Sequence, residues 1–312
     1  EMVPDSLLNR WDSITYVHFE PKISGRFRWE HADELIFSPS APLLPATTYS
    51  PQPGKELLAN NEYDKVTVDK PIEFFTPDLK LENSNTTWVL AEGKAVPQVD
   101  LYFNYAISPA VLKDKLEVKM EGEKKNYSIQ TLNNDKKVTI RIVDIKPEDK
   151  DYTTTVLLAK GLIPDGGKNP TKESLEERFT IPSPYNLVIT NVDSRHDGLS
   201  ATVKVYTSQQ VTEEGLKKFI TIKPTVKFDV QAEEDGFIVS GDGFDAGKTY
   251  EILLAKGLRG KLGGSLKEDY SGDIAFGELE PSISFVNSKA VYLSAQGNKN
   301  IEVRITNTEK VK

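Results

Sequence analysis

The stretch Leu157-Leu-Ala-Lys-Gly-Leu162 recurs without change as Leu253-Leu-Ala-Lys-Gly-Leu258. In both places it lies a few residues after a tyrosine, Tyr152 in the first case and Tyr250 in the second. Self-similarity of this kind indicates that a chain is built from repeated structural units.

A second repeated feature lies upstream of each copy and has the pattern of a single helical turn. Ile107-Ser-Pro-Ala-Val-Leu-Lys113 is similar to Val3-Pro-Asp-Ser-Leu-Leu-Asn9, 104 residues earlier, and to Val211-Thr-Glu-Glu-Gly-Leu-Lys217, 104 residues later. Each has Ser, Thr or Pro near its start and an apolar residue five positions after its first residue, a pattern that favours a capped helical turn. The repeat therefore has three copies of about 100 residues, the size of one Ig-like sandwich.

The three copies also share one order of strand patterns. Each short helix is followed by a strand, an alternating strand, a turn that ends in Tyr, and a last strand. These segments are 16–21, 34–37, 45–49 and 72–77 in the first copy, 116–119, 137–142, 147–152 and 178–182 in the second, and 219–224, 236–239, 245–250 and 273–276 in the third. A tyrosine just past a turn is typical of Greek-key sandwiches, where its hydroxyl bonds back to the turn.

Short strands separated by turns, without alternating helices, predict an all-β fold of tandem Ig-like antiparallel β-sandwiches, each with one short helix. We predict a sandwich at 1–77 that lacks its first strands, a second at 78–182, a third at 183–280, and the opening strands of a further, truncated domain at 281–312. Opening strands are seen at 79–81, 87–90 and 99–103, at 187–189 and 201–206, and at 283–285, 291–293 and 301–305. On this ground we expect a fragment of a longer modular protein.

Composition narrows the class of protein. The chain of 312 residues carries a net charge of −8, and its densest lysine stretch, 113–125, is interleaved with glutamates. This argues against a nucleic-acid partner. No apolar run reaches the ~18 residues of a membrane span. Cysteine is absent and His occurs three times, so thiol chemistry is excluded and the usual catalytic base is scarce.

Two motifs suggest catalysis but have simpler explanations. Asp242–Thr249 is similar to a phosphate loop, which needs four residues between its glycines; Gly241 to Gly247 leaves five and Gly243 to Gly247 leaves three. The residues Asp193, Ser194, His196 and Asp197 crowd one polar segment, which is more typical of a hairpin loop than of a catalytic triad.

Two further clusters suggest ligands. The acids Glu148, Asp149, Asp151 and Asp165 lack the spacing of a calcium loop and alternate with lysines. Tyr102, Phe103 and Tyr105 could offer a platform to a sugar, but neighbours along a strand face opposite sides. We therefore predict no catalytic, cofactor or metal site in this chain.

Three stretches resemble the N-terminal region of bacterial alpha-2-macroglobulin-like proteins. They are Phe19-Glu-Pro-Lys-Ile-Ser-Gly-Arg-Phe-Arg-Trp29 with Leu44-Pro-Ala-Thr-Thr-Tyr49, Leu258-Arg-Gly-Lys-Leu-Gly-Gly264 with Asp269-Tyr270, and Pro281-Ser-Ile-Ser-Phe285 with Ile301-Glu-Val-Arg-Ile-Thr-Asn307. The resemblance implies macroglobulin-type sandwiches in an envelope or secreted protein that traps proteases, often through a Cys-based thioester. Without cysteine this chain carries no thioester, and no long insert stands out as a bait segment.

The expected function is therefore a non-catalytic scaffold segment of such a protease-trapping protein. Its partners would be macroglobulin domains of the same chain, and proteases only through the full-length protein, which the resemblance places in the periplasm, at the cell surface (with or without a lipid anchor) or outside the cell. The alternative is an Ig-like adhesin or a carbohydrate- or protein-binding module of a bacterial surface protein. Short junctions with Pro at 77–78, 182–184 and 280–281 predict semi-rigid units in an elongated array.

Overall fold

The computed structural model describes residues 5–59, 70–277, 282–285 and 303–306. In these ranges the fold is all-β, as predicted, and every sheet is antiparallel except the two-residue parallel pair of β15 (Asn186–Leu187) with β22 (Ser265–Leu266). Buried apolar side chains form three separate clusters, each between two sheets. We refer to them in chain order as the first, second and third sandwich.

The second sandwich contains the longest strands. One of its sheets has the order β11 (Tyr127–Ile129), β12 (Asp135–Ile142), β8 (Lys94–Ile107) and β7 (Leu81–Ala91), and the other has the order β10 (Glu123–Lys125), β9 (Leu116–Met120), β13 (Tyr152–Leu158) and β14 (Leu175–Ile181). Glu92 and Gly93 close the β7–β8 hairpin with φ of 49° and 76°, as in a tight two-residue turn. The predicted opening segment 87–90 lies within β7, whereas of the predicted segment 79–81 only Leu81 belongs to that strand.

The third sandwich repeats this arrangement. One sheet has the order β16 (Ile189–His196), β17 (Ala201–Thr207), β20 (Gly236–Gly241) and β19 (Asp229–Glu233), and the other β18 (Ile220–Lys223), β21 (Thr249–Leu254) and β23 (Tyr270–Ala275). The prediction of a hairpin loop at 193–197 was wrong in position. Strand β16 continues through His196 by pairing with Ala201, and the turn follows at 197–200.

The first sandwich is smaller. One of its sheets has the order β1 (Trp11–Asp12), β3 (Gly25–His31) and β4 (Glu34–Pro39). The other has the order β2 (Val17–Glu20), β5 (Thr48–Pro53) and β6 (Phe74–Phe75). Its buried cluster contains Tyr16, Phe27 and Trp29. The hairpin β3–β4 takes the place that β11–β12 and β19–β20 hold in the other two sandwiches, but among the described residues no strand lies on the far side of β4.

All three tyrosines just past a turn bond back to that turn, as the sequence predicts. The hydroxyl of Tyr49 accepts the Leu44 N–H at 2.8 Å, that of Tyr152 accepts the Glu148 N–H at 2.7 Å, and that of Tyr250 accepts the Asp245 N–H at 2.8 Å. Each ring is at most 4% exposed, so one residue anchors both the turn and the edge of a core.

The short helices agree with the sequence only in part. The predicted turn at 107–113 is the α-helix α1 (Pro109–Lys113), which begins with a proline in its first turn. The predicted turn at 3–9 contains the 3₁₀ helix η1 (Asp5–Leu7), whereas the one at 211–217 overlaps only the start of the 3₁₀ helix η3 (Leu216–Phe219). A further 3₁₀ helix, η2 (Lys55–Leu58), lies in the first sandwich. Helix η3 starts late because Gly215, with φ of 73°, interrupts the turn, and Val211 bridges to Gly260 instead.

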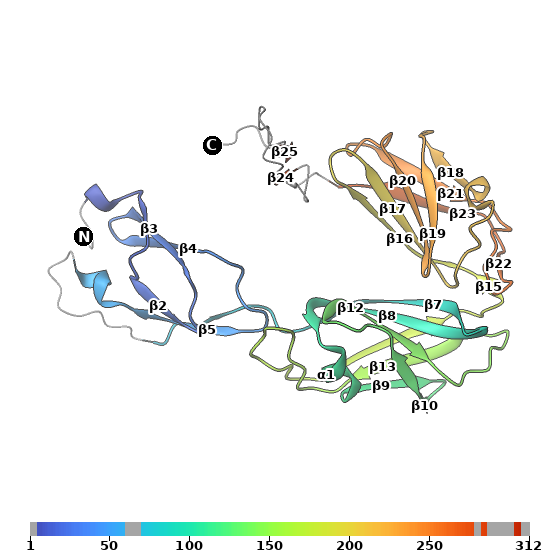
Figure 1. The fold of residues 1–312 in the computed structure, drawn as a ribbon, viewed down its shortest axis with the longest axis horizontal. Helices are drawn as coiled ribbons and strands as arrows, with labels where there is room; N and C mark the ends of the chain where they lie inside the picture. Colours follow the sequence, from blue (N-terminus) through green and yellow to red (C-terminus); the bar gives the residue numbers. More distant parts are fainter. Residues whose placement is uncertain (1–4, 60–69, 278–281, 286–302, 307–312) are drawn as a thin grey trace, which may run out of the picture.

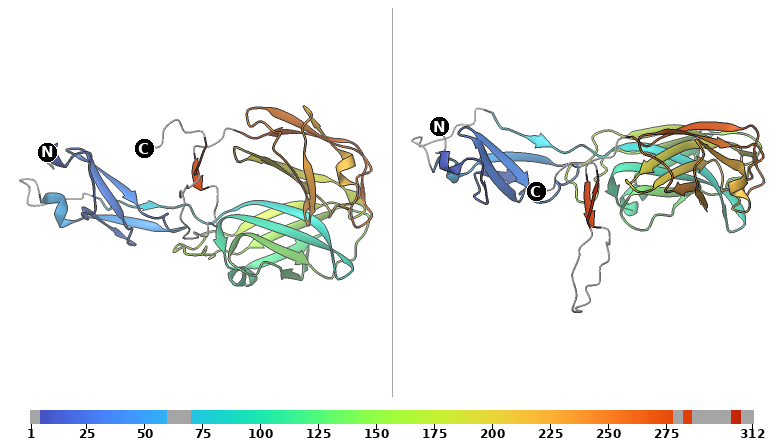
Figure 2. Two further views of the ribbon diagram at one scale, coloured as in Figure 1. Left: turned by 45° about the horizontal axis from the view of Figure 1, so that its top comes forward. Right: turned by 90° about the horizontal axis from the view of Figure 1, so that it is seen from above.

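Figure 1 shows the first sandwich extended along the long axis, whereas the third folds back beside the second. The sheet β7–β8–β12 faces the sheet β16–β17–β20, so the predicted elongated array is present at one junction only. The pair β24 (Ser282–Phe285) and β25 (Val303–Thr306) forms a sheet of its own, and the right view of Figure 2 shows it projecting away from the sandwiches. The predicted strand at 291–293 lies outside the described residues. Within the described ranges no helix combines the length and apolar character of a bilayer-crossing segment.

Candidate functional site

The second and third sandwiches are joined at Trp88 of β7. Its N–H donates to Ser208 O at 2.7 Å, and its carbonyl accepts the Gln210 N–H at 3.2 Å. The indole is fully buried in the second core and donates Nε1–H to Pro182 O at 2.7 Å. This single residue therefore connects a core, the linker and the segment that follows β17.

Other contacts extend this joint. Thr87 donates its hydroxyl to Thr207 O at 2.6 Å, and Leu90 donates its N–H to the side chain of Gln210 at 3.3 Å. The buried Gln209 side chain donates to Pro184 O at 3.0 Å. A Cβ on Gly260 or Gly264 would collide with that side chain, so the loop around Gln209 requires glycine at both positions.

Charged groups reach across the same junction from the turn between β19 and β20. Glu234 accepts a hydrogen bond from Arg141 of β12 at 2.5 Å, and Asp235 lies 3.6 Å from the Lys137 ammonium. Asp235 is only 6% exposed. A buried carboxylate requires a positive partner, because its desolvation is otherwise uncompensated.

The charges alternate in sign along this cluster. Lys137 pairs with Asp100 at 2.8 Å, and Lys204 pairs with Asp235 at 2.5 Å and also with Glu233. We call these five residues the charge ladder. Because each inner member has an opposite charge on either side, loss of the charge on one member would leave a buried neighbour without a partner at the junction.

Two opposing effects set the pKa values in this region: burial disfavours the charged form of each group, and a partner of opposite charge favours it. Burial raises the pKa of Asp100, although Lys137 opposes the shift. Burial lowers the pKa of Lys137 and Lys204, but their carboxylate partners raise it by more, so both ammonium groups titrate above 10.5. Burial also raises the pKa of Tyr102 and Tyr206 above 10.0, with their mutual proximity adding to the shift at Tyr206.

A cleft of about 620 Å³ opens between the two facing sheets beside this joint. Each of the two sheets contributes an asparagine and a tyrosine that are paired on neighbouring strands. Asn83 of β7 pairs with Tyr102 of β8, and Asn191 of β16 pairs with Tyr206 of β17. Residues paired across two strands share a face of the sheet. The rest of the lining is Ser, Thr and Asn together with Phe179 and three charged residues, Glu82, Asp193 and Arg195. The volume lies in the range of small-ligand sites.

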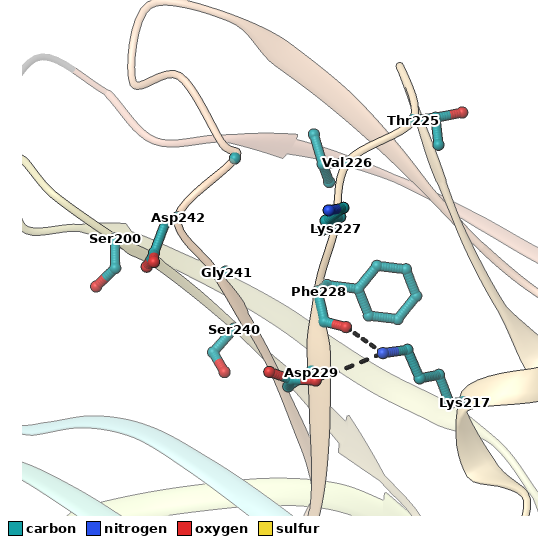
Figure 3. Close-up of a pocket in the computed structure, with 11 residues that line it drawn as sticks. Ser200, Lys217, Thr225, Val226, Lys227, Phe228, Asp229, Ser240, Gly241 and Asp242 are labelled. Carbon is teal, nitrogen blue, oxygen red and sulfur yellow. Dashed lines mark hydrogen bonds and ion pairs between the residues drawn. The ribbon is translucent and has the colours of Figure 1, made fainter.

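A larger hollow of about 1090 Å³ belongs to the third sandwich alone. In Figure 3 Lys217 lies along the ring of Phe228 and bonds to the Phe228 carbonyl, with Asp229 3.5 Å away. Ser200 and Asp242 lie on the opposite side. The lining contains neither His nor Cys, so it offers no nucleophile–base pair of the usual kind.

The residues that suggested a triad are occupied elsewhere. Ser194 donates to Ala275 O at 2.8 Å, while the His196 ring bonds to Phe244 O at 3.0 Å and accepts the Gly198 N–H at 3.0 Å. His196 therefore helps to close its own sandwich. The segment 242–249 is a turn, as predicted, in which Asp245 accepts the Gly247 N–H at 3.0 Å.

The acidic cluster at 148–151 holds the linker between the second and third sandwiches. Asp149 accepts the Ser183 hydroxyl at 2.7 Å, Asp151 accepts the Ser183 N–H at 2.8 Å, and Glu148 pairs with Lys150. Over the described residues no group of three or more His, Cys, Asp or Glu is arranged to hold a metal ion.

The three aromatics at 102–105 do not form one platform. Phe103 is 2% exposed in the second core, and Tyr105 packs against that core. Tyr102 alone faces outward, and its partner across the cleft is Tyr206 from the other sandwich. The mixed lysine face is as predicted, because Glu117 pairs with both Lys119 and Lys124.

The sequence did not reveal the joint or the charge ladder. Asp100 occupies an outward position between Val99 and Leu101, where solvent exposure is the usual outcome, yet it is 2% exposed. The one local signal was the Leu258–Gly264 stretch, whose glycines enclose Gln209.

No family model matches the chain, and no curated protein matches it either. Solved structures do match, among them SGBP-B of the Bacteroides ovatus mixed-linkage glucan utilization locus in complex with a mixed-linkage heptasaccharide. The identity is 11%, the match covers 93% of this chain and 69% of that one, and the TM-score is 0.27. At that TM-score the similarity carries no inference about this chain.

Proposed function

We propose that this chain is a non-catalytic structural segment of a larger bacterial protein of the alpha-2-macroglobulin-like kind. The observation that carries the proposal is the joint at Trp88, which holds two sandwiches in one fixed orientation. A segment that positions other domains needs such fixed junctions, whereas a set of independent modules does not.

The chemistry of the described residues supports a structural role. The polar clusters that could have served catalysis are consumed by internal bonds, as at Ser194 and His196. The acids at 149 and 151 are consumed in the same way by the linker residue Ser183. Proteases would be engaged by other parts of the full-length protein, and this segment would set their placement.

Double electron–electron resonance tests the fixed orientation. Since the chain has no cysteine, Asn134→Cys and Glu268→Cys place one spin label on the second and one on the third sandwich. We expect a narrow distance distribution, as narrow as that of the control pair Asn134→Cys and Glu173→Cys within the second sandwich. A broad distribution for the first pair alone would overturn the proposal, as would stoichiometric inhibition of trypsin by this chain.

A second candidate function is supported by the cleft. Two tyrosines line this cleft, each paired across two strands with an asparagine, among Ser, Thr and Asn side chains and three charged ones. Amide and hydroxyl groups bond neutral polyols, and tyrosine rings offer an apolar face with a polar edge. The cleft therefore fits a short neutral oligosaccharide, as a binding module at a cell surface would require.

Isothermal titration with maltohexaose, cellohexaose, xylohexaose and chitohexaose tests this second candidate. We expect one of them to bind with a Kd of about 1 mM or tighter and to lose binding in Tyr102→Ala and Tyr206→Ala. Phe228→Ala, in the separate hollow of the third sandwich, is the matched control and should leave binding unchanged. No binding by any of the four would refute the carbohydrate function and leave the structural one standing.

A further inference from the structure

We propose that the free edge of β4 in the first sandwich takes up the strand pair β24–β25 of a second copy of this chain. The inference is independent of the function proposed above. It starts from a comparison of the three sandwiches: β12 is covered by β8 in the second, and β20 is covered by β17 in the third. In the first, β4 holds the corresponding place, and among the described residues its outer side has no strand.

The covering strand supplies much of the core where it is present. Strand β8 contributes Val99, Leu101 and Phe103, each at most 2% exposed, and β17 contributes three more fully buried residues, Ala201, Val203 and Val205. Among the described residues of the first sandwich, the buried cluster has three members. Its Trp29 is buried, and the indole Nε1 has no hydrogen-bond partner.

Strand β4 is suited to accept a strand. Leu35, Ile36 and Phe37 are all partly exposed, so apolar side chains occupy both faces of this edge. An edge strand presents unpaired N–H and C=O groups, and proteins usually protect it with lysine, proline or a bulge. Here a charged residue and a proline stand only at the ends, Glu34 and Pro39, which leaves 35–38 open to pairing.

The pair β24–β25 has the form of the strand pair that covers β12 and β20 in the other two sandwiches. Its strands are antiparallel to each other, as in β7–β8 and β16–β17, and they belong to none of the three sandwiches. The sequence Ile301-Glu-Val-Arg-Ile305 alternates apolar and polar residues like Val99-Asp-Leu-Tyr-Phe103 of β8. A two-stranded sheet alone is marginally stable in water, so the pair gains from any sheet that it can extend.

A second copy is the better donor because both junctions within one chain are already made. The third sandwich is fixed by the joint at Trp88, and the first is bonded to the second where Ala46 O accepts the Asn169 N–H at 2.6 Å. With both junctions in place, β24–β25 does not pair with β4. In the proposed contact, β25 of another copy pairs with β4 in the antiparallel direction, as β8 pairs with β12. This addition breaks neither junction and generates a head-to-tail contact between copies.

Mixing two single-cysteine chains tests the exchange. One carries Glu34→Cys on β4 and the other Thr306→Cys on β25, which an antiparallel pairing of the two strands brings together, and a short bismaleimide links them. Because the chain has no cysteine of its own, a heterodimeric product reports this contact alone. The matched control replaces Glu34→Cys by Arg10→Cys, at the opposite edge of the same sheet.

We expect heterodimer from the β4 cysteine and little from the control, together with concentration-dependent dimers or higher species in sedimentation. Deletion of 281–312 should abolish both, with no loss of the folded first sandwich by circular dichroism. A monomer at all concentrations without crosslinking would overturn the proposal. A second contrary result would be a crosslink within one chain that carries both cysteines, combined with no crosslink between the two single-cysteine chains. That result would also overturn the proposal.

Discussion

The two junctions of this molecule differ in what holds them. Between the second and third sandwiches, the main chain of Trp88 pairs with the neighbouring unit on both sides and its indole enters a core. Between the first and second, Ala46 O accepts two N–H groups from 168–169, and Asn169 donates to Thr48 at 2.9 Å. We therefore expect a rigid junction where a buried side chain and backbone pairing coincide, and more motion where one loop touches another.

Removal of the Trp88 side chain should have the largest effect. Trp88→Ala leaves a cavity in the second core and should lower the free energy of unfolding by about 3–5 kcal/mol. It should also separate the unfolding of the second and third sandwiches into two transitions by differential scanning calorimetry. Trp11→Ala, at an indole that is 40% exposed in the first sandwich, is the control and should cost less than about 1 kcal/mol. Similar losses in the two variants would mean that Trp88 does not hold the junction.

The charge ladder should come next. Asp235→Ala removes a buried carboxylate between two lysines and should cost about 2–3 kcal/mol, because the ammonium groups lose their shared partner. Urea unfolding of Asp235→Ala, Lys137→Met and the double variant forms a thermodynamic cycle. Losses that add within about 0.5 kcal/mol would show that the two residues do not act on one another across the junction.

Alkaline pH should weaken the same junction without any substitution. The pKa of Lys137 and Lys204 is raised above the ordinary 10.5, so their stabilising effect is complete below pH 10.5 and is lost as pH rises through the folded-state pKa. The raised pKa of Tyr102 and Tyr206 acts in the same direction from pH 10.0 upward. The Tm of the wild type should therefore fall more steeply above pH 10 than that of Lys137→Met. Parallel curves would contradict this account.

What the sequence predicted well depends on local chemistry. Tyr49, Tyr152 and Tyr250 could be assigned to their turns because a tyrosine corner involves residues four to six positions apart. Strand alternation likewise predicted that Tyr102 and Phe103 face opposite sides, and in the structure Phe103 is buried while Tyr102 lines the cleft. These features depend on the alternation of residues along a strand and on contacts between residues a few positions apart. They do not depend on how one sandwich packs against another.

The junction was beyond such reasoning for a physical reason. Alternation assigns Asp100 to the outer face, but it does not say whether water or another sandwich covers that face. The turn at 233–235 lies more than 130 residues from Asp100 in the chain, and no local pattern connects them. The same holds for the cleft, which needs one tyrosine from each of two sandwiches.

The smallest effect should be at the first junction. Asn169→Ala removes the bond to Thr48 and should cost at most about 1 kcal/mol, since a partly exposed hydrogen bond contributes little net free energy. The Tm should hardly change, because the cores on either side are intact. The distance distribution between labels at Lys22→Cys and Glu173→Cys should nevertheless broaden, while that between Asn134→Cys and Glu268→Cys stays narrow. The contrary result is a wild-type distance distribution that is as narrow across the first junction as across the second, and that stays narrow in Asn169→Ala. The contrast between the two junctions would then be wrong, because a loop contact alone would suffice to fix two sandwiches.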